Sequence, residues 1–390
     1  MSTPAAHILQ SPRLNTVFLP EGVIRGMRPS SQSRPASFTD HYEGRVLFYD
    51  VFWHENGKTV LMVGPPPIDL DARYGKMACI ALPSGRRLAW REHNSKRVRL
   101  CAAKAPPGTT HIRIQYAGQA QDIDVGPNQS AFFAGKRVLF AVSKNNQLGW
   151  IGDWARFHAV NQGTDGVVLF DNGSTDYRRQ DIEAVLAGVP GVERVAVLSV
   201  PFAFGRQDEW IPKDQFWSQF LQASLFLVMF RRFGQTAYGM LNCDIDELAV
   251  PNPDGDVYQA AAHSRSGTAY FGGAWVAPVP EANRTPPFRH ADFRRLEADP
   301  AAGMGRAHKW AMVPNRWWLR RLNVHPYPHS LQKRPLFGRR YMPGGAYIAH
   351  FRGISTSWKY ERQIDAAAGE GLRVEPALAR ALDRAFPGGE

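Results

Sequence analysis

Four short apolar runs, separated by helix-like stretches, constrain the fold of this 390-residue chain more than any other feature. The runs are residues 138–142, 167–170, 195–200 and 238–243. Between them, apolar residues recur at helical spacing, and each helical stretch ends before Gly163, Gly188 or Gly234, where a C-terminal cap is expected. Strands that alternate with helices predict an α/β fold with a mainly parallel sheet and right-handed crossovers.

The chain divides into four predicted segments. Residues 1–38 end in a polar, proline-containing stretch at 29–37, so we expect a disordered tail. Residues 39–130 contain short β-type runs, two of them around the turn Asn56-Gly57, which predict a small antiparallel β domain. We assign residues 134–372 to the α/β domain and residues 373–390 to a C-terminal helical tail.

The composition indicates a globular protein without a membrane-spanning helix. Hydrophobic residues make up 44% of the sequence, and no apolar run approaches the roughly 20 residues that cross a bilayer. Residues 1–10 lack the basic flank and long apolar stretch of a secretory signal. The three cysteines are far apart and fit neither a zinc site nor a disulfide framework. We therefore expect a cytoplasmic protein.

Most of the net charge of +12 lies in one segment of the sequence. Residues 284–340 contain 13 Lys or Arg against three acidic residues. A localised basic surface suits a phosphorylated ligand, an anionic membrane or a nucleic acid. We expect a phosphorylated ligand and no nucleic acid, and peripheral contact between this segment and the inner face of the membrane is a separate hypothesis.

Asp244 and Asp246 directly follow the fourth apolar run, where a buried strand would reach the surface. Carboxylates of this kind suit Mn²⁺ or Mg²⁺, which commonly bind through one or two carboxylates together with substrate phosphates. An Asp-x-Asp triplet is also common on solvated loops, so neighbouring residues are needed to interpret it as a metal site. Ligands gather at the carboxyl ends of parallel strands, and the polar residues 143–146 and 171–176 fall at the same edge. The sequence therefore predicts a metal and diphosphate site.

Asp171 ends the second apolar run and begins a polar turn with Ser174. Its carboxylate is a candidate for contact with the ribose or base of a nucleotide. The same two residues also suit an Asx turn and a helix cap without any ligand. The residues alone leave both interpretations open.

Several segments, in order along the chain, resemble glycosyltransferases of families 2 and 92. The resemblance covers about residues 138–362 and does not include the predicted β domain. It implies the GT-A nucleotide-sugar transferase fold. Two positions depart from the family pattern, Asn146 where an acid often follows Lys-Asn and Asp153 where Glu usually precedes Trp. The matching segments are Phe170-Asp171-Asn172-Gly173-Ser174-Thr175-Asp176, Leu241-Asn242-Cys243-Asp244-Ile245-Asp246-Glu247, Tyr270-Phe271-Gly272-Gly273, His308-Lys309, Val324-His325 and Ala349-His350-Phe351-Arg352.

The resemblance implies a role for the matching residues. The expected ligands of Mn²⁺ or Mg²⁺ are Asp244, Asp246 and His350. The nucleotide-binding candidates are Lys144, Asn145, Asp171, Asp176, Asp244, Lys309 and Arg352. The families suggest an inverting transfer, which needs a carboxylate base for the acceptor hydroxyl, and Glu281 and Asp292 are the candidates. Aromatic residues of this half, among them Trp275, either stack on sugar rings or lie in the core.

Together these features predict a metal-dependent glycosyltransferase. It would move a sugar, such as a hexose, from a nucleotide diphosphate donor, a UDP-sugar, to a glycan or lipid-linked acceptor in polysaccharide biosynthesis. A nucleotidyltransferase or phosphoesterase is the alternative, although residues 143–146 contain no glycine for a phosphate loop. A third class is a non-catalytic binding module. Binding that depends steeply on salt and needs no metal would favour this class.

Overall fold

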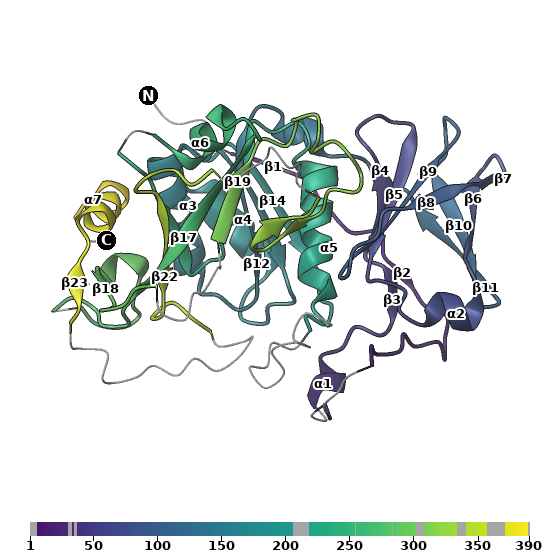
Figure 1. Cartoon of the computed structure of the whole chain (residues 1–390), viewed down its shortest axis with the longest axis horizontal. Coiled ribbons are helices and arrows are strands. Elements are labelled where there is room, and N and C mark those ends of the chain that lie inside the picture. Colours follow the sequence, from purple (N-terminus) through teal and green to yellow (C-terminus); the bar gives the residue numbers. More distant parts are fainter. Residues whose placement is uncertain are drawn as a thin grey trace.

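The structure is a computed structural model, and two units lie side by side in it. A large α/β unit and a smaller β unit flank helix α5 (Phe220–Val228) (Figure 1). The described residues are 6–29, 33–34, 37–205, 218–253, 255–282, 284–301, 308–333, 341–356 and 371–388.

The elements have the following bounds. The large sheet contains β1 (His7–Ile8), β12 (Arg137–Ser143), β13 (Gly166–Asp171), β14 (Arg194–Ser199), β15 (Gly239–Asn242), β16 (Glu247–Val250), β17 (Thr268–Val276), β18 (Arg295–Leu296), β19 (His308–Met312), β22 (Tyr347–Phe351) and β23 (Arg373–Val374). The smaller sheets contain β2 (Val17–Phe18), β3 (Val46–Phe48), β4 (Asp50–Trp53), β5 (Thr59–Gly64), β6 (Ala78–Leu82), β7 (Arg86–Leu88), β8 (Trp90–Glu92), β9 (Arg99–Lys104), β10 (His111–Tyr116), β11 (Gln119–Asp124), β20 (Pro326–Tyr327) and β21 (Ser330–Leu331). The other helices are α1 (Ser37–Asp40), α2 (Leu70–Tyr74), α3 (Leu148–Gln162), α4 (Arg179–Ala187), α6 (Val257–His263), α7 (Pro376–Ala385), η1 (Ser130–Phe133), η2 (Met229–Phe233) and η3 (His290–Asp292).

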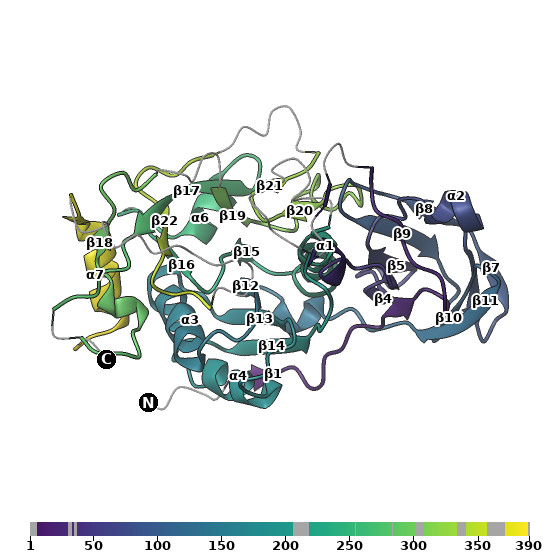
Figure 2. The same cartoon turned by 90° about the horizontal axis from the view of Figure 1, so that it is seen from below.

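The four predicted apolar runs form neighbouring strands of one sheet. Strands β14, β13, β12 and β15 follow one another in this order, and all of their pairings are parallel (Figure 2). Alternate residues enter two different cores, so that Leu139 packs with α3 and α4 while Phe140 packs with α5. Because helices cover both faces, these strands are apolar throughout rather than alternating. This part of the predicted fold is confirmed.

Beyond β15 the large sheet becomes mixed. Strand β19 pairs antiparallel with both β15 and β17. Strand β22 then pairs parallel with β17 and antiparallel with β16. The predicted parallel sheet is therefore one half of a larger sheet, and the second half places β19 beside β15 and β22 beside β16.

The smaller unit is a sandwich of two antiparallel sheets, ordered β4-β5-β9-β8 and β11-β10-β6-β7. Asn56 and Gly57 lie in the turn between β4 and β5, and Gly57 adopts a left-handed φ of 61° that suits glycine. The antiparallel architecture agrees with the sequence, while residues 39–130 as domain boundaries stay a proposal.

The described residues 6–29 are not the disordered tail that the sequence predicts. Strand β1 pairs parallel with β14, and β2 pairs antiparallel with β3. Val17 is fully buried, and Arg25 is 1% exposed. The guanidinium of Arg25 donates to the carbonyl oxygens of Glu43, Val46 and Pro66. Main-chain pairing and this buried arginine thus order a segment that the sequence analysis assigns to the tail.

The predicted C-terminal tail is also part of the large unit. The helix expected within residues 373–390 is α7, but it packs on α3 and its Leu378 and Leu382 are fully buried. Strand β23 pairs with β18 at the edge of the large sheet. The apolar face of α7 thus completes the core on the α3 side.

Helix α5 is buried on all sides between the two units. All of its residues are buried, and Phe226 packs edge-on against Phe140 of the large sheet with ring centroids 5.0 Å apart. The π-helix η2 that follows carries Arg232, whose Nη1 lies 2.7 Å from Asp50 Oδ2 in an ion pair that is 3% and 0% exposed. Among the described helices, none is both long and apolar enough to span a membrane.

His158 joins α3 to β16, and its protonation is expected to destabilise the fold. Its Nδ1 donates to the carbonyl oxygen of Trp154 at 2.8 Å, and its Nε2 accepts the amide of Ala249 at 3.1 Å, so the ring is neutral. Burial lowers the pKa of His158 from 6.5 to about 4. The unfolded chain takes up the proton first, so stability that is fully present above pH 6.5 falls as the pH approaches 4. The loss from this side chain amounts to about 3 kcal/mol.

Urea unfolding at about pH 7.5 and about pH 5 tests this dependence. His158→Gln is expected to flatten it, whereas His41→Gln, which changes an exposed histidine, is expected to keep the wild-type dependence. Equal pH dependence in both variants would contradict the assignment.

Candidate active site

The loops that follow β12, β13, β14 and β15 meet at one edge of the large sheet. The last residues of three of these strands, Ser143, Asp171 and Ser199, pair side by side. Asn242 pairs with Phe140 of β12, so the chain that continues from Asn242 to Asp244 reaches the same edge. The structure thus brings together the polar segments that sequence reasoning places at the carboxyl ends of the strands.

Residues 244–247 form a tight turn, called here the acidic turn. The amide of Glu247 donates to the carbonyl oxygen of Asp244 at 3.0 Å, and the amide of Asp244 donates to Glu247 Oε2 at 2.8 Å. Ile245 is 2% exposed and anchors the turn in the core, while Asp244 and Asp246 stay partly exposed. Glu247, to which sequence reasoning gave no role, therefore shapes the turn that presents the two aspartates.

Lys309 from β19 bridges two carboxylates of the acidic turn. Its Nζ lies 3.0 Å from Asp244 Oδ2 and 2.8 Å from Glu247 Oε2, and the lysine is 3% exposed. Burial alone would lower the pKa of Lys309, but the charges of Asp244 and Glu247 outweigh it and raise that pKa above its usual value. Burial raises the pKa of Glu247, and Lys309 opposes this shift. Lys309 thus places a permanent positive charge beside Asp244.

Asp246 lies beside His350, as the predicted metal site requires. The distance from His350 Nε2 to Asp246 Oδ2 is 3.2 Å, and His350 Nδ1 lies 3.9 Å from Glu247 Oε1. Trp275 from the neighbouring strand β17 stacks on the His350 ring, with centroids 4.2 Å apart and an interplanar angle of 27°. The indole thus fixes the plane of the imidazole.

These residues fit a divalent cation whose coordination is completed by water and substrate. Two ligand atoms at right angles around Mg²⁺ or Mn²⁺ are about 3 Å apart, close to the separation of Asp246 Oδ2 and His350 Nε2. Asp244 Oδ2 is already bound to Lys309, which favours Asp246 and His350 as direct ligands. Within the described ranges, no group of three or more His, Cys, Asp or Glu side chains is arranged to hold a metal. A cation at Asp246 and His350 would therefore need further ligands from water or substrate.

Trp275→Leu is expected to weaken Mn²⁺ binding by about tenfold or more, because residues that orient a metal ligand typically contribute this much to affinity. Trp275→Phe keeps an aromatic ring over His350 and is expected to stay close to wild type. Electron paramagnetic resonance of unbound Mn²⁺ measures the affinity without any turnover. Trp317→Leu is the matched control, because Trp317 is 63% exposed. If Trp275→Leu and Trp317→Leu bind Mn²⁺ equally, the stacking has no positioning role.

The loops after β12 and β13 are cross-linked into a second polar cluster. Asp171 Oδ1 accepts the amide of Ser174 at 3.2 Å and its hydroxyl at 2.5 Å, so Asp171 does close its own turn. The Asn145 amide donates to Ser174 Oγ at 2.9 Å, and Asn145 Oδ1 accepts the amide of Thr175 at 2.8 Å. Asn145 has an unusual left-handed φ of 52°. Asparagine adopts this conformation more readily than most other non-glycine residues.

Two other nucleotide-binding candidates border this cluster. Asp176 Oδ1 accepts the hydroxyl of Thr175 at 3.0 Å. The carbonyl oxygen of Lys144 lies within 3.5 Å of Thr356 Oγ1, so the chain that follows β22 returns to the end of β12. The structure therefore gathers Lys144, Asn145, Asp171 and Asp176 at the edge that also carries the acidic turn.

Glu281 and Asp292 are both held by arginines. Glu281 Oε1 lies 3.2 Å from Arg295 Nε, and Asp292 Oδ1 lies 3.2 Å from Arg284 Nε. Asp292 belongs to η3, which also contains His290, and His290 Nε2 lies 2.9 Å from the carbonyl oxygen of Ile245. Asp292 is thus linked to the acidic turn through a neighbouring residue, and Glu281, earlier in the same loop, donates its amide to the Asp292 carbonyl oxygen at 2.8 Å.

Arg352 and Asp153 have supporting positions. Arg352 pairs with Glu297, and its guanidinium carbon lies 4.1 Å from the Trp275 ring centroid. This places the arginine behind the Trp275–His350 stack. Asp153 accepts hydrogen bonds from Arg289 Nε at 2.7 Å and Nη2 at 2.5 Å, which holds the loop before η3. The departure from the family pattern at position 153 therefore keeps a carboxylate with a structural role.

Comparison with known proteins gives weak similarities. No protein-family model and no curated protein matches the sequence. The solved structures that match include the mannosyltransferase Ktr4p from S. cerevisiae, at 10% identity and a TM-score of 0.25 over 37% of this chain and 41% of that one. Its complex with GDP gives the same values over 42% of that chain. Core-mannan synthase A from Aspergillus fumigatus in its Mn/GDP form matches at 12% identity and a TM-score of 0.23, over 37% of this chain and 44% of that one. This chain spans less than half the length of each, and similarity at this level establishes neither family nor activity.

Proposed function

We propose that this protein is a metal-dependent glycosyltransferase that uses a nucleotide diphosphate sugar. The observation that carries the proposal is the pairing of Asp246 with His350 at a sheet edge, where the loops containing Asn145 and Asp171 also converge. A carboxylate, an imidazole and polar loops around one edge suit a cation that holds a diphosphate beside a nucleoside. We further propose a UDP-sugar as donor, inversion at the transferred sugar and a glycan or lipid-linked acceptor.

Each part of the edge has a distinct role in this proposal. A bound Mn²⁺ or Mg²⁺ would act as a Lewis acid for the departing diphosphate. Lys309 adds a fixed positive charge beside Asp244 and stays protonated because two carboxylates surround it. The cross-linked turn of Asp171 offers carboxylate and main-chain groups to the nucleoside. Asp292 and Glu281 stay the candidates for the base that takes the acceptor proton.

Release of a nucleoside diphosphate tests this function directly. Purified protein is expected to hydrolyse at least one sugar nucleotide slowly in the presence of Mn²⁺ and to stop when the metal is chelated. The panel should contain UDP-glucose, UDP-galactose, UDP-N-acetylglucosamine and GDP-mannose, and substrate binding is followed in parallel. Neither binding nor hydrolysis of any donor with Mn²⁺ would refute the proposal.

The products of the same assay distinguish the alternative function. A nucleotidyltransferase or phosphoesterase would cleave within the phosphates and release a nucleoside monophosphate or inorganic phosphate. The glycosyltransferase releases the nucleoside diphosphate and the free sugar in equal amounts. Exclusive release of a monophosphate would favour the alternative.

A cytoplasmic location with peripheral membrane contact stays a separate proposal. Within residues 284–340, several cations are already paired with carboxylates, which reduces the charge available to a membrane. These pairs are Arg284–Asp292, Arg289–Asp153, Arg294–Asp383, Arg295–Glu281 and Arg320–Glu55. Residues 302–307 and 334–340 of this segment lie outside the described residues. Sedimentation with anionic liposomes at low salt, and release at high salt, tests the contact.

A further inference from the structure

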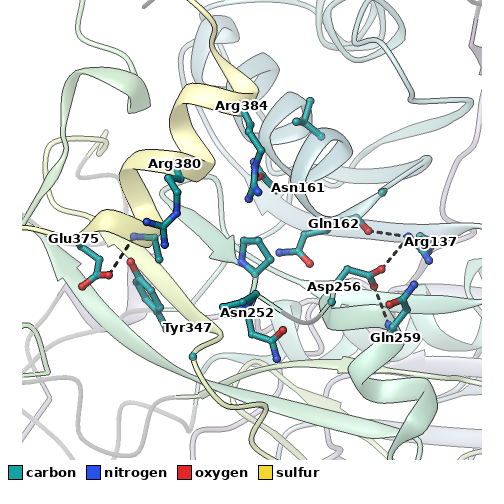
Figure 3. Close-up of a pocket in the computed structure, with 17 residues that line it drawn as sticks. Arg137, Asn161, Gln162, Asn252, Asp256, Gln259, Tyr347, Glu375, Arg380 and Arg384 are labelled. Carbon is teal, nitrogen blue, oxygen red and sulfur yellow. Dashed lines mark hydrogen bonds and ion pairs between the residues drawn. The ribbon is translucent and has the colours of Figure 1, made fainter.

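We propose that a cavity at the opposite edge of the large sheet is a second ligand site, which takes an anionic sugar. The cavity has a volume of about 930 Å³, within the range of small-ligand sites. Its walls come from the end of α3, the loop between β16 and α6, the start of β22 and helix α7 (Figure 3). The shared chemistry of the ligand is a phosphate or carboxylate group on a hydroxyl-rich ring.

The cavity is separate from the acidic turn. Arg137, in the cavity wall, begins β12, and Ser143 ends the same strand at the edge of the candidate active site. A strand of this length spans about 20 Å at roughly 3.3 Å per residue. A ligand bound here would therefore not occupy the proposed donor site.

Two arginines on α7 give the cavity its preference for an anion. Arg380 and Arg384 are four residues apart on this helix and extend from the same side of it (Figure 3). Like charges at this spacing repel each other, and a bound anion would relieve the repulsion. In the described part of the chain, neither arginine has a carboxylate partner. Arg384 Nε instead donates to Asn161 Oδ1 at 3.0 Å, which fixes the side chain and leaves its other nitrogens for a ligand.

The acidic side chains of the cavity are engaged within the protein. Asp256 Oδ2 lies 3.2 Å from Arg137 Nη1, so this pair has no net charge. Glu375 Oε1 accepts the amide of Ala377 at 3.3 Å at the start of α7. Arg380 and Arg384 outnumber the remaining carboxylate, Glu375, so the wall formed by α7 keeps a net positive charge.

The rest of the cavity is suited to hydroxyl groups. Its lining includes the amides of Asn252 and Gln259 and the phenol of Tyr347. The Tyr347 hydroxyl is buried and has no hydrogen-bond partner among the described residues. Pro251 and Pro253 add rigid apolar surface against which one side of a sugar ring can lie.

Binding by full-length Asp246→Asn protein without Mn²⁺ tests this site, because the proposed donor site is then disabled. Isothermal titration at low salt would use glucose 1-phosphate, glucuronate, glucose and inorganic phosphate as probes. We expect glucose 1-phosphate or glucuronate to bind more tightly than both glucose and inorganic phosphate. The tighter of the two anionic sugars identifies the anion as a phosphate or a carboxylate.

Adding Arg380→Ala and Arg384→Ala is expected to weaken binding of the anionic sugar by about tenfold or more, as expected for charge-assisted hydrogen bonds. Arg86→Ala with Arg91→Ala is the matched control, since it removes the same charge from exposed positions of the β sandwich. Circular dichroism confirms that each variant is folded. The proposal is overturned if no anionic sugar binds, if inorganic phosphate binds as tightly, or if both double variants bind equally. None of these outcomes depends on sugar transfer at the acidic turn, so failure here is distinguishable from failure of the proposed function.

Discussion

Asp246→Asn is expected to reduce Mn²⁺-dependent release of the nucleoside diphosphate by about a thousandfold, because several kcal/mol of charge stabilisation depend on the metal. The substitution keeps the shape of the side chain but removes its charge. The side chains of Asp246 and His350 are 15% and 16% exposed, so solvent reaches both, and the isosteric substitution is expected to leave the fold intact. Donor hydrolysis, Mn²⁺ affinity and thermal unfolding of the same preparation measure the three effects.

Asp122→Asn provides the control for Asp246→Asn. Asp122 is an exposed carboxylate of β11, paired with Arg113, and lies in the β sandwich outside the candidate active site. It is expected to retain wild-type hydrolysis. If Asp246→Asn keeps both Mn²⁺ affinity and hydrolysis, the acidic turn is not the metal site.

Lys309→Ala is expected to reduce the free energy of unfolding by about 3–5 kcal/mol, the cost of removing one partner from a buried ion pair. The substitution leaves Glu247, which is 4% exposed, without its nearest positive charge. Its carboxylate would then have to take up a proton or force the acidic turn to open. Urea unfolding at neutral pH measures the loss, and hydrolysis is expected to fall as well because Asp244 also loses its partner.

Lys136→Ala is the matched control for Lys309→Ala, because it removes a lysine that bridges two carboxylates at a more exposed position. Lys136 also bridges two carboxylates, with its Nζ 3.3 Å from Asp165 Oδ2 and 2.5 Å from Glu193 Oε2, but its side chain is 21% exposed. Exposed pairs of this kind contribute at most about 1 kcal/mol. Combining Lys309→Ala with Glu247→Gln is expected to recover part of the lost stability, because it removes the unpaired charge. Equal destabilisation by Lys309→Ala and Lys136→Ala would show that burial of the ion pair does not matter.

The sequence predicts the parallel half of the large sheet well because its signals are local. Runs such as residues 167–170 are apolar on both faces, and the helices between them end at glycines, so each element can be identified without its partners. Strands β17, β19 and β22 lack such signals, because their partners are distant in sequence. The two-residue strand β1 is ordered by pairing with β14 nearly 190 residues later, and no local pattern indicates that contact.

In the candidate site, too, the sequence predicts residues that form local motifs but not contacts between strands that are distant in sequence. Asp244 and Asp246 form a local motif, and the resemblance points to His350 and Lys309. The bridge from Lys309 to Glu247 and the stack of Trp275 on His350 depend on the register between strands, which the sequence does not supply. Glu247 directly follows the Asp-x-Asp motif, so an acid at this position was the available signal.

The complete enclosure of α5 limits how this protein can be divided for experiments. Six of the nine residues of this helix are Phe, Leu or Val, and the helix is covered by the central sheet on one side and by β5 on another. Truncation before β12, intended to isolate the catalytic half, would expose this surface to solvent and leave Arg232 without Asp50. Such a fragment should aggregate, so crystallisation and assays need the full-length polypeptide or a redesigned, polar outer face on that helix.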